Sequence, residues 1–136
     1  MTLVIDASVA LSWCFDDEAT AETDAIAHEI ARTGAFVPSL FHLEISNILL
    51  HAERRGRIAI ADVTQRLELI SKLPLEVDHQ TSARAADQIL ALARAEKLTV
   101  YDAAYLELAI RKGFTLATKD RQLAAAARHV GVPVRG

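Results

Sequence analysis

The chain has 136 residues, of which 51% are hydrophobic and 24% charged, which is typical of one compact domain, here expected to span residues 1–136. This composition excludes a largely disordered chain, and the single cysteine, Cys14, excludes a disulfide scaffold and favours a reducing, cytoplasmic location. Charges interrupt every long apolar run, so we expect no membrane span. Because the formal net charge is −3, binding to nucleic acid would require a local basic patch or a bound cation.

Short apolar segments alternate with helical patterns along the chain. In chain order, the pattern predicts a strand over residues 3–5, helices over 8–15 and 19–33, a strand over 35–37, helices over 40–56 and 60–73, a strand over 75–77, helices over 81–97 and 102–112, a strand over 115–117, a helix over 121–129 and a strand over 132–134. Ser39 is placed to cap a helix, and Gly34 and Gly113 are placed to end helices. Residues 98–100 fit either a further strand or the approach to a helix.

This alternation of helices with short apolar strands favours an α/β fold with a parallel sheet covered on both faces. Open sheets of this kind bind ligands at the carboxyl ends of their strands. Three acids are expected at that edge, because Asp6 follows residues 3–5, Asp102 follows 98–100 and Asp120 follows 115–117. A fourth acid, Glu44, lies on a largely apolar stripe of its helix and is placed to reach the same edge.

Each of these acids also has an ordinary structural interpretation. The three aspartates are suited to cap helices, and Glu44 fits the edge of an apolar stripe with its carboxylate in solvent. Together they indicate more, because two carboxylates ~5 Å apart repel by ~3 kcal/mol at an effective dielectric of about 20. Such a cluster takes up protons or binds a divalent cation, and oxygen ligands without clustered His or Cys favour Mg²⁺ or Mn²⁺. That chemistry suits hydrolysis of a phosphodiester by a metal-activated water.

Four motifs carry a family resemblance. They are VIDASVAL at residues 4–11, VPSL at 37–40 followed by Glu44 and Asn47, LTVYDAAYLELA at 98–109, and LATKDRQL at 116–123, with GVPV at 131–134 near the end. In this order they resemble the PIN-domain family, and within it the VapC-like toxin ribonucleases of type II toxin–antitoxin systems. The resemblance extends over nearly the whole chain.

The resemblance implies a PIN-like three-layer α/β/α sandwich around a central, mostly parallel sheet. It implies an endoribonuclease that depends on Mg²⁺ or Mn²⁺, forms a homodimer, cleaves RNA such as tRNA or rRNA, and is silenced by a cognate VapB-like antitoxin. The residues that match the family's catalytic and metal-binding acids are Asp6, Glu44, Asp102 and Asp120. Those that match supporting polar positions are Ser8, Asn47 and Thr118, which local hydrogen bonding would equally explain.

Basic residues near the motifs are candidates for RNA contact. Lys119 and Arg121 flank one of the acids, whereas Arg54, Arg55 and Arg57 follow the helix that carries Glu44. For the second group we favour a simpler interpretation, in which cations at a helix C-terminus complement the helix dipole.

Three other functions remain open from the sequence. A receiver-type signalling domain also uses strand-end aspartates and Mg²⁺, but it expects an acidic pair after the first strand and leaves Glu44 unexplained. A haloacid-dehalogenase-type phosphatase expects a second aspartate where Ser8 stands. A PIN-fold module that binds RNA or protein without cleavage is the third, although such a module has no need of four mutually repelling acids.

Overall fold

The centre of the molecule is a five-stranded sheet. The structure is a computed structural model, and it describes residues 2–136. The strands lie in the order β3-β2-β1-β4-β5 and all pairs are parallel. Their bounds are β1 Leu3–Ile5, β2 Ala35–Pro38, β3 Leu75–Asp78, β4 Thr115–Ala117 and β5 Val134–Arg135. The parallel sheet is therefore confirmed, whereas this order differs from the 2-1-3-4-5 order of receiver-type sheets, so that alternative is wrong.

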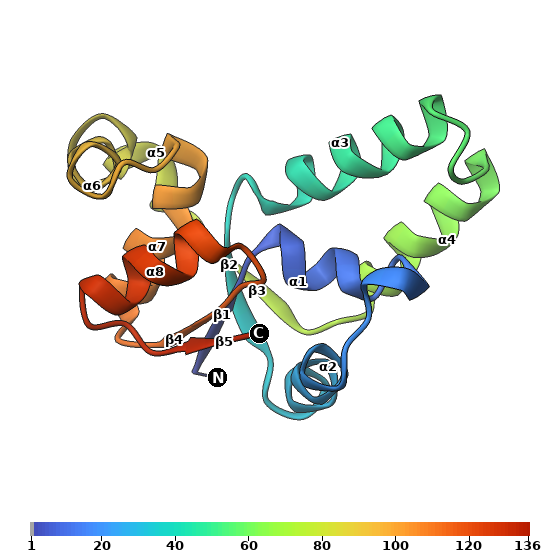
Figure 1. Cartoon of the computed structure of the whole chain (residues 1–136), viewed down its shortest axis with the longest axis horizontal. Coiled ribbons are helices and arrows are strands. Elements are labelled where there is room, and N and C mark those ends of the chain that lie inside the picture. The colour runs from blue at the N-terminus through green and yellow to red at the C-terminus, as the bar shows by residue number, and fades with distance from the viewer. Residues whose placement is uncertain (1) are drawn as a thin grey trace.

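Helices cover both faces of the sheet (Figure 1). The helices are α1 Ala7–Ser12, α2 Ala21–Thr33, α3 Phe41–Arg54, α4 Ile60–Ser71, α5 Thr81–Arg84, α6 Leu90–Glu96, α7 Val100–Lys112 and α8 Arg121–His129, with a 3₁₀ turn η1 at Asp16–Glu18 and a π-helical turn η2 at Ala85–Ile89. The sheet grows from β1 to β3 in one direction and from β1 to β5 in the other, and right-handed crossovers then place α1, α2 and α4 on one side and α7 and α8 on the other. The expected α/β/α layers are thus confirmed.

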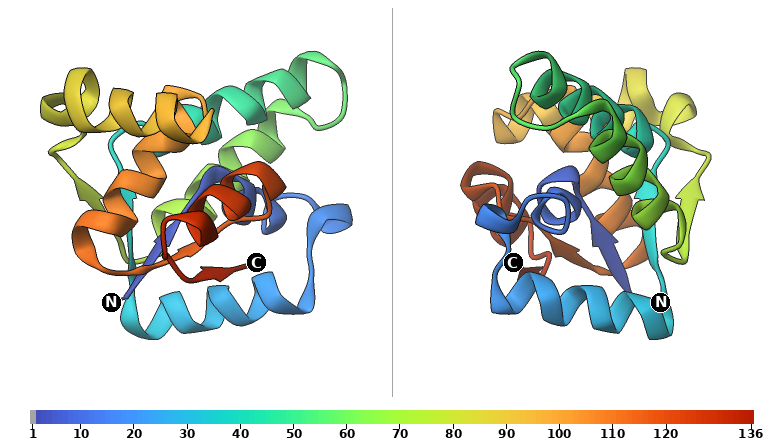
Figure 2. Two further views of the ribbon diagram at one scale, coloured as in Figure 1. Left: turned by 60° about the vertical axis from the view of Figure 1, so that its left-hand side comes forward. Right: turned by 90° about the vertical axis from the view of Figure 1, so that its right-hand side faces the viewer.

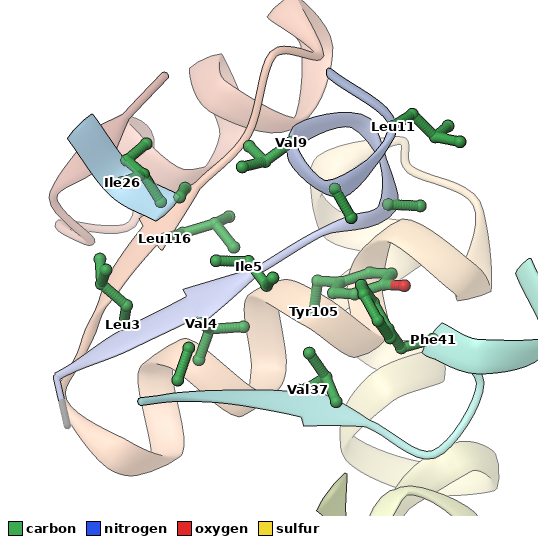
Figure 3. Packing of buried hydrophobic residues seen from close by; sticks show 14 of the residues in the cluster. Leu3, Val4, Ile5, Val9, Leu11, Ile26, Val37, Phe41, Tyr105 and Leu116 are labelled. Atoms are coloured by element: carbon green, nitrogen blue, oxygen red, sulfur yellow. The ribbon is translucent and has the colours of Figure 1, made fainter. Parts of the chain in front are cut away.

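The central strand is apolar along its whole length because both of its faces are covered. Val4 and Ile5 are fully buried, and Val4 pairs with Phe36 on one side and Leu116 on the other. Figure 3 shows side chains from α1, α2, α3 and α7 packed around this strand, among them the ring of Tyr105. The carboxyl end of β1 is therefore held rigidly at the centre of the fold.

A buried ion pair fixes α7 against the sheet. The Arg111 guanidinium donates to both carboxylate oxygens of Asp78, at the end of β3, over 3.0 and 2.8 Å, and its Nε donates to Glu107 over 2.9 Å. These hydrogen bonds lower the pKa of Asp78 below its ordinary value, because they favour the charged carboxylate. Since α7 also carries Asp102, the network helps to set the position of that acid.

Of the two alternatives left open for residues 98–100, the structure shows the approach to a helix, and these residues form no strand. Lys97 ends α6 in the left-handed conformation, with φ 57°, and the chain turns at once into α7. The Thr99 hydroxyl accepts a hydrogen bond from the Asp102 N–H over 3.1 Å and so caps that helix. Asp102 therefore lies in the first turn of α7 and does not follow a strand.

Other boundaries also differ from the prediction. The predicted helix over 81–97 is interrupted by η2, and the predicted helix over 8–15 stops at Ser12, where η1 follows after a short turn. Ser39 does not cap α3, since its N–H donates to Thr81 Oγ1 over 3.4 Å and the residue before the helix is Leu40. The last strand starts at Val134 rather than residue 132, because the backbone N–H of Val132 closes the end of α8 by donating to Ala127.

The helices of residues 2–136 are too short or too polar to cross a membrane. The longest, α3, has 14 residues, whereas a span needs about 20 apolar ones.

Candidate active site

The four predicted acids meet above the carboxyl ends of the strands. Asp6 follows β1 and Asp120 lies between β4 and α8, while Glu44 and Asp102 lie in the first turns of α3 and α7. Figure 1 shows the starts of α1, α3, α7 and α8 at the same end of the sheet, and Figure 2 shows α2 at the opposite end of the molecule. The expected convergence of these acids is what the fold produces.

Asp6 is the most buried of the four, with 5% of its surface exposed. Its Oδ1 caps α1 by accepting from the Val9 N–H over 3.2 Å and also accepts from Ser8 Oγ over 2.6 Å. Its Oδ2 accepts from Thr118 Oγ1 over 2.5 Å. The structural and functional interpretations of Asp6 are thus compatible, because capping holds the carboxylate in one orientation.

Ser8 and Thr118 join the two strand-end loops. The Thr118 hydroxyl accepts from the Asp120 N–H over 3.0 Å, and Ser8 Oγ accepts from the Lys119 N–H over 2.8 Å. Asp120 in turn caps α8, where its Oδ1 accepts from the Leu123 N–H over 2.9 Å. Both hydroxyls therefore lie between the Asp6 carboxylate and the backbone that positions Asp120.

Glu44 is held by a tyrosine to which the sequence analysis gave no role. Tyr105 is 1% exposed, and its hydroxyl donates to Glu44 Oε1 over 2.5 Å. The tyrosine lies three residues after Asp102, on the same face of α7, and that spacing was the available signal in the sequence. Tyr105 therefore links the two helices that carry these acids.

Three of the four acids, Asp6, Glu44 and Asp102, have a raised pKa, first because of burial and then because of neighbouring charges. Burial raises the pKa of Asp6 most strongly, hydrogen bonds from Ser8 and Thr118 partly offset this, and Asp120 adds to the increase. Burial is also the main cause of the raised pKa of Glu44, to which Asp102 and Asp6 contribute. For Asp102, burial comes first and the charges of Asp120 and Asp6 follow. The four side chains thus lie close enough to act electrostatically as one group.

The chemistry of this group fits a hard divalent cation. All the donors are carboxylate oxygens, and a positive charge would offset both the burial of these charges and the repulsion between them. Within residues 2–136, however, no three His, Cys, Asp or Glu side chains are close enough to form a ready-made metal cage. A cation held here would be bound first by one or two acids, the arrangement that Mg²⁺ often uses in proteins.

Asn47 lies beside Glu44 in a pocket of ≈ 570 Å³ whose other lining residues are Leu40, Leu43 and Tyr101. Leu43 and Tyr101 are unusually exposed for their size, at 76% and 65%. The acids therefore have an open, partly apolar surface on the α3 side.

The basic candidates fall into two groups. Lys119 and Arg121 border a second pocket next to Asp120. Arg54 and Arg55 lie at the other end of α3, and ten residues of helix separate Arg54 from Glu44 by about 15 Å.

Arg57 of the second group is exposed but already paired within the chain. It donates to Asp17 over 2.9 Å and lies 3.9 Å from the centre of the Phe15 ring. This supports a structural role for the basic end of α3.

Comparison with known proteins finds relatives over most of the chain. A model of the family described as "PIN domain" matches residues 3–129. The chain is 33% identical over 102 residues to "Ribonuclease VapC3" of Mycobacterium tuberculosis, covering 75% of this chain and 72% of that protein. It is 30% identical over 124 residues to "Ribonuclease VapC3" of Pyrobaculum aerophilum, covering 91% and 93%.

Solved structures match over almost the full length. A crystal structure of a Pyrobaculum aerophilum protein has a TM-score of 0.74 and 26% identity, covering 98% of this chain and 90% of that one. The structure of FitAcB from Neisseria gonorrhoeae has a TM-score of 0.67 over 98% and 96% of the two chains, and at 14% identity it shows a shared fold alone. The chain is therefore a member of the PIN-domain family, with the VapC ribonucleases among its relatives.

Proposed function

We propose that this protein is an endoribonuclease that depends on Mg²⁺ or Mn²⁺. The observation that carries the proposal is the meeting of Asp6, Glu44, Asp102 and Asp120 at one edge of the sheet, where three of the four have raised pKa values. Placing repelling carboxylates together, Asp6 buried and Glu44 and Asp102 half-buried, costs stability, and a metal site is the use that explains all four acids. The ribonuclease names of the two relatives support RNA as the substrate.

The residues of the chain would divide the work as follows. Asp6 and Asp102 would hold the cation most directly, with Glu44 and Asp120 completing its surroundings. Once bound, the cation would supply Lewis acidity towards a water molecule and towards the phosphodiester. Ser8 and Thr118 keep the Asp6 oxygens in a fixed orientation, while Tyr105 does the same for one oxygen of Glu44.

We further propose that the protein acts in the cytoplasm as the toxin of a type II toxin–antitoxin pair. In this role it would form a homodimer, cleave an RNA such as tRNA or rRNA, and be inhibited by a VapB-like antitoxin. The VapC names of its relatives support this assignment.

The test is a cleavage assay on total RNA and on a tRNA pool, with Mg²⁺, with Mn²⁺ and with EDTA. We expect discrete fragments that require the metal. Asp102→Asn should lower the rate by more than the roughly 10–100-fold that loss of an outer metal partner costs. The matched control is Asp87→Asn, an exposed acid in η2, which should cleave like the parent.

Three outcomes would count against the proposal. Fragments that persist in Asp102→Asn would contradict the site assignment, and cleavage in EDTA would contradict the metal requirement. If no RNA is cut while RNA still binds, the protein is a binding module without catalysis.

A further inference from the structure

A second pocket borders the active site on the side of α8. Its volume is ≈ 330 Å³. Its lining includes Asp120, one of the four acids, and Thr118, which donates to Asp6. Arg121, Ala124 and Arg128 line it from one face of α8, since they are spaced by three and four residues along the helix. Ala124 carries only a methyl group, which leaves open space between the two guanidinium groups.

Two of the basic side chains that line this pocket already have partners in the protein. Arg135 is already paired with Glu22 over 3.0 Å and with Glu29, and Lys119 Nζ donates to the Glu18 carbonyl over 2.5 Å.

For the α8 arginines the situation differs. In the part of the chain that the structure describes, Arg121 and Arg128 have no carboxylate within 4.0 Å. Their positive charge is thus available to a ligand.

The position of Arg121 is not explained by helix stability. It is the first residue of α8, where the helix dipole disfavours a cation, whereas Arg128 lies in the last turn, where the dipole favours one. An anion bound between the two side chains would account for the position of Arg121.

We infer that this pocket binds a backbone phosphate of the RNA strand, one that neighbours the phosphate to be cleaved. The inference rests on the proposed function. Guanidinium groups suit phosphate because they donate two parallel hydrogen bonds to its oxygens. An RNA strand with one phosphate at the acids would pass Asp120, which borders both sites, and enter the basic pocket. The pocket would thus give this protein a local cationic contact for RNA despite its net charge of −3.

The test compares two double variants that remove the same charge. Arg121→Gln with Arg128→Gln alters the pocket, and Arg54→Gln with Arg55→Gln alters the exposed far end of α3. Both pairs are made in the Asp102→Asn protein, so that RNA is not cut. Binding of a short single-stranded oligoribonucleotide is measured by fluorescence anisotropy over a series of salt concentrations, and melting curves check that each variant is folded.

We expect the pocket pair to weaken binding by about tenfold or more and to reduce the salt slope by about 0.7 for each phosphate that the pocket no longer binds. The α3 pair should leave the slope unchanged. Oligonucleotides with one neutral methylphosphonate linkage then locate the bound phosphate. A methylphosphonate at one linkage near the cleavage site should weaken binding of the oligonucleotide to the Asp102→Asn protein. It should have no effect on binding to the variant that also carries Arg121→Gln and Arg128→Gln.

Equal losses of affinity for the two double variants would overturn the inference, while RNA cleavage by the unmodified protein would leave the proposed function standing. Normal RNA binding by the variant with Arg121→Gln and Arg128→Gln would also overturn the inference and leave the proposed function standing. If the parent neither binds nor cleaves RNA, both proposals fail.

Discussion

Replacing Asp102 by asparagine should stabilise the metal-free protein. The substitution keeps the shape of the side chain and removes one charge from the acid group. Carboxylates about 6–8 Å apart repel by ~2 kcal/mol at an effective dielectric of 20. Burial raises the pKa of Asp102 most and the charges of Asp120 and Asp6 add to this increase, but the side chain is partly exposed and solvent screens the repulsion. We therefore expect a net gain of about 1–2 kcal/mol in the free energy of unfolding.

The assay is thermal unfolding followed by circular dichroism, in EDTA and in Mn²⁺. For a chain of this length, 1 kcal/mol shifts the melting temperature by about 3–4 °C. In EDTA, Asp102→Asn should melt about 3–8 °C above the parent. In Mn²⁺ the order should reverse, because a ligand at a hundredfold excess over its Kd stabilises the parent by about 2.7 kcal/mol and the variant has lost a ligand.

Asp87→Asn is the matched control, and it should melt like the parent in both conditions. A variant at Asp102 that melts below the parent in EDTA would refute the repulsion, because it would show that the carboxylate stabilises the fold. Equal shifts of parent and variant on adding Mn²⁺ would refute the metal site at this position. Either result is obtained without knowing the RNA substrate.

Two further predictions follow from the same side chains. Thr118→Val removes the hydroxyl that donates to Asp6 Oδ2. We expect it to lower the free energy of unfolding by about 1–3 kcal/mol and the cleavage rate by roughly 10–100-fold. A variant with the parent's stability and cleavage rate would contradict this role. In EDTA, the stability of the parent should rise as the pH falls from 7 towards the unfolded pKa values of 3.8 for Asp6 and Asp102 and 4.5 for Glu44, because acids with raised pKa bind protons more tightly in the folded state. Below 3.8 it should fall again as Asp78, whose pKa is lowered, becomes protonated, and a denaturant midpoint that declines steadily from pH 7 would contradict this assignment.

Local patterns in the sequence predicted most of the strands and the acids that follow them. The strand over residues 3–5 and the helix over 121–129 agree with the structure in both bounds, because a short β-branched run and a helix preceded by Asp120 are unambiguous local signals. For residues 98–100 the sequence left both a strand and the approach to a helix open, since a short apolar run looks the same in either case, and the structure shows the approach to a helix. The π-helical turn η2 has no local signature of this kind.

Contacts between distant parts of the chain were not predictable in this way. Tyr105 and Glu44 are 61 residues apart, and although Tyr105 shares a helix face with Asp102, the local pattern does not show that its hydroxyl bonds to Glu44. The same holds for Arg57, which the sequence offered as a possible RNA contact and which pairs with Asp17, 40 residues away. Sequence spacing therefore identified the acids, whereas the residues that orient them required the fold.

The two interpretations of Asp6 and Asp120 that the sequence left open are not in competition. Each carboxylate caps a helix, and the cap aligns the side chain and uses only part of the capacity of its oxygens to accept hydrogen bonds. A group already oriented by its own backbone loses little entropy when it binds a cation, so capping prepares these acids for the task. The cost is the mutual repulsion of the charges that they bring together. That repulsion is why the cation should matter to the stability of this protein as well as to its chemistry. It is also why melting of Asp102→Asn in EDTA and in Mn²⁺ tests the repulsion and the metal site together.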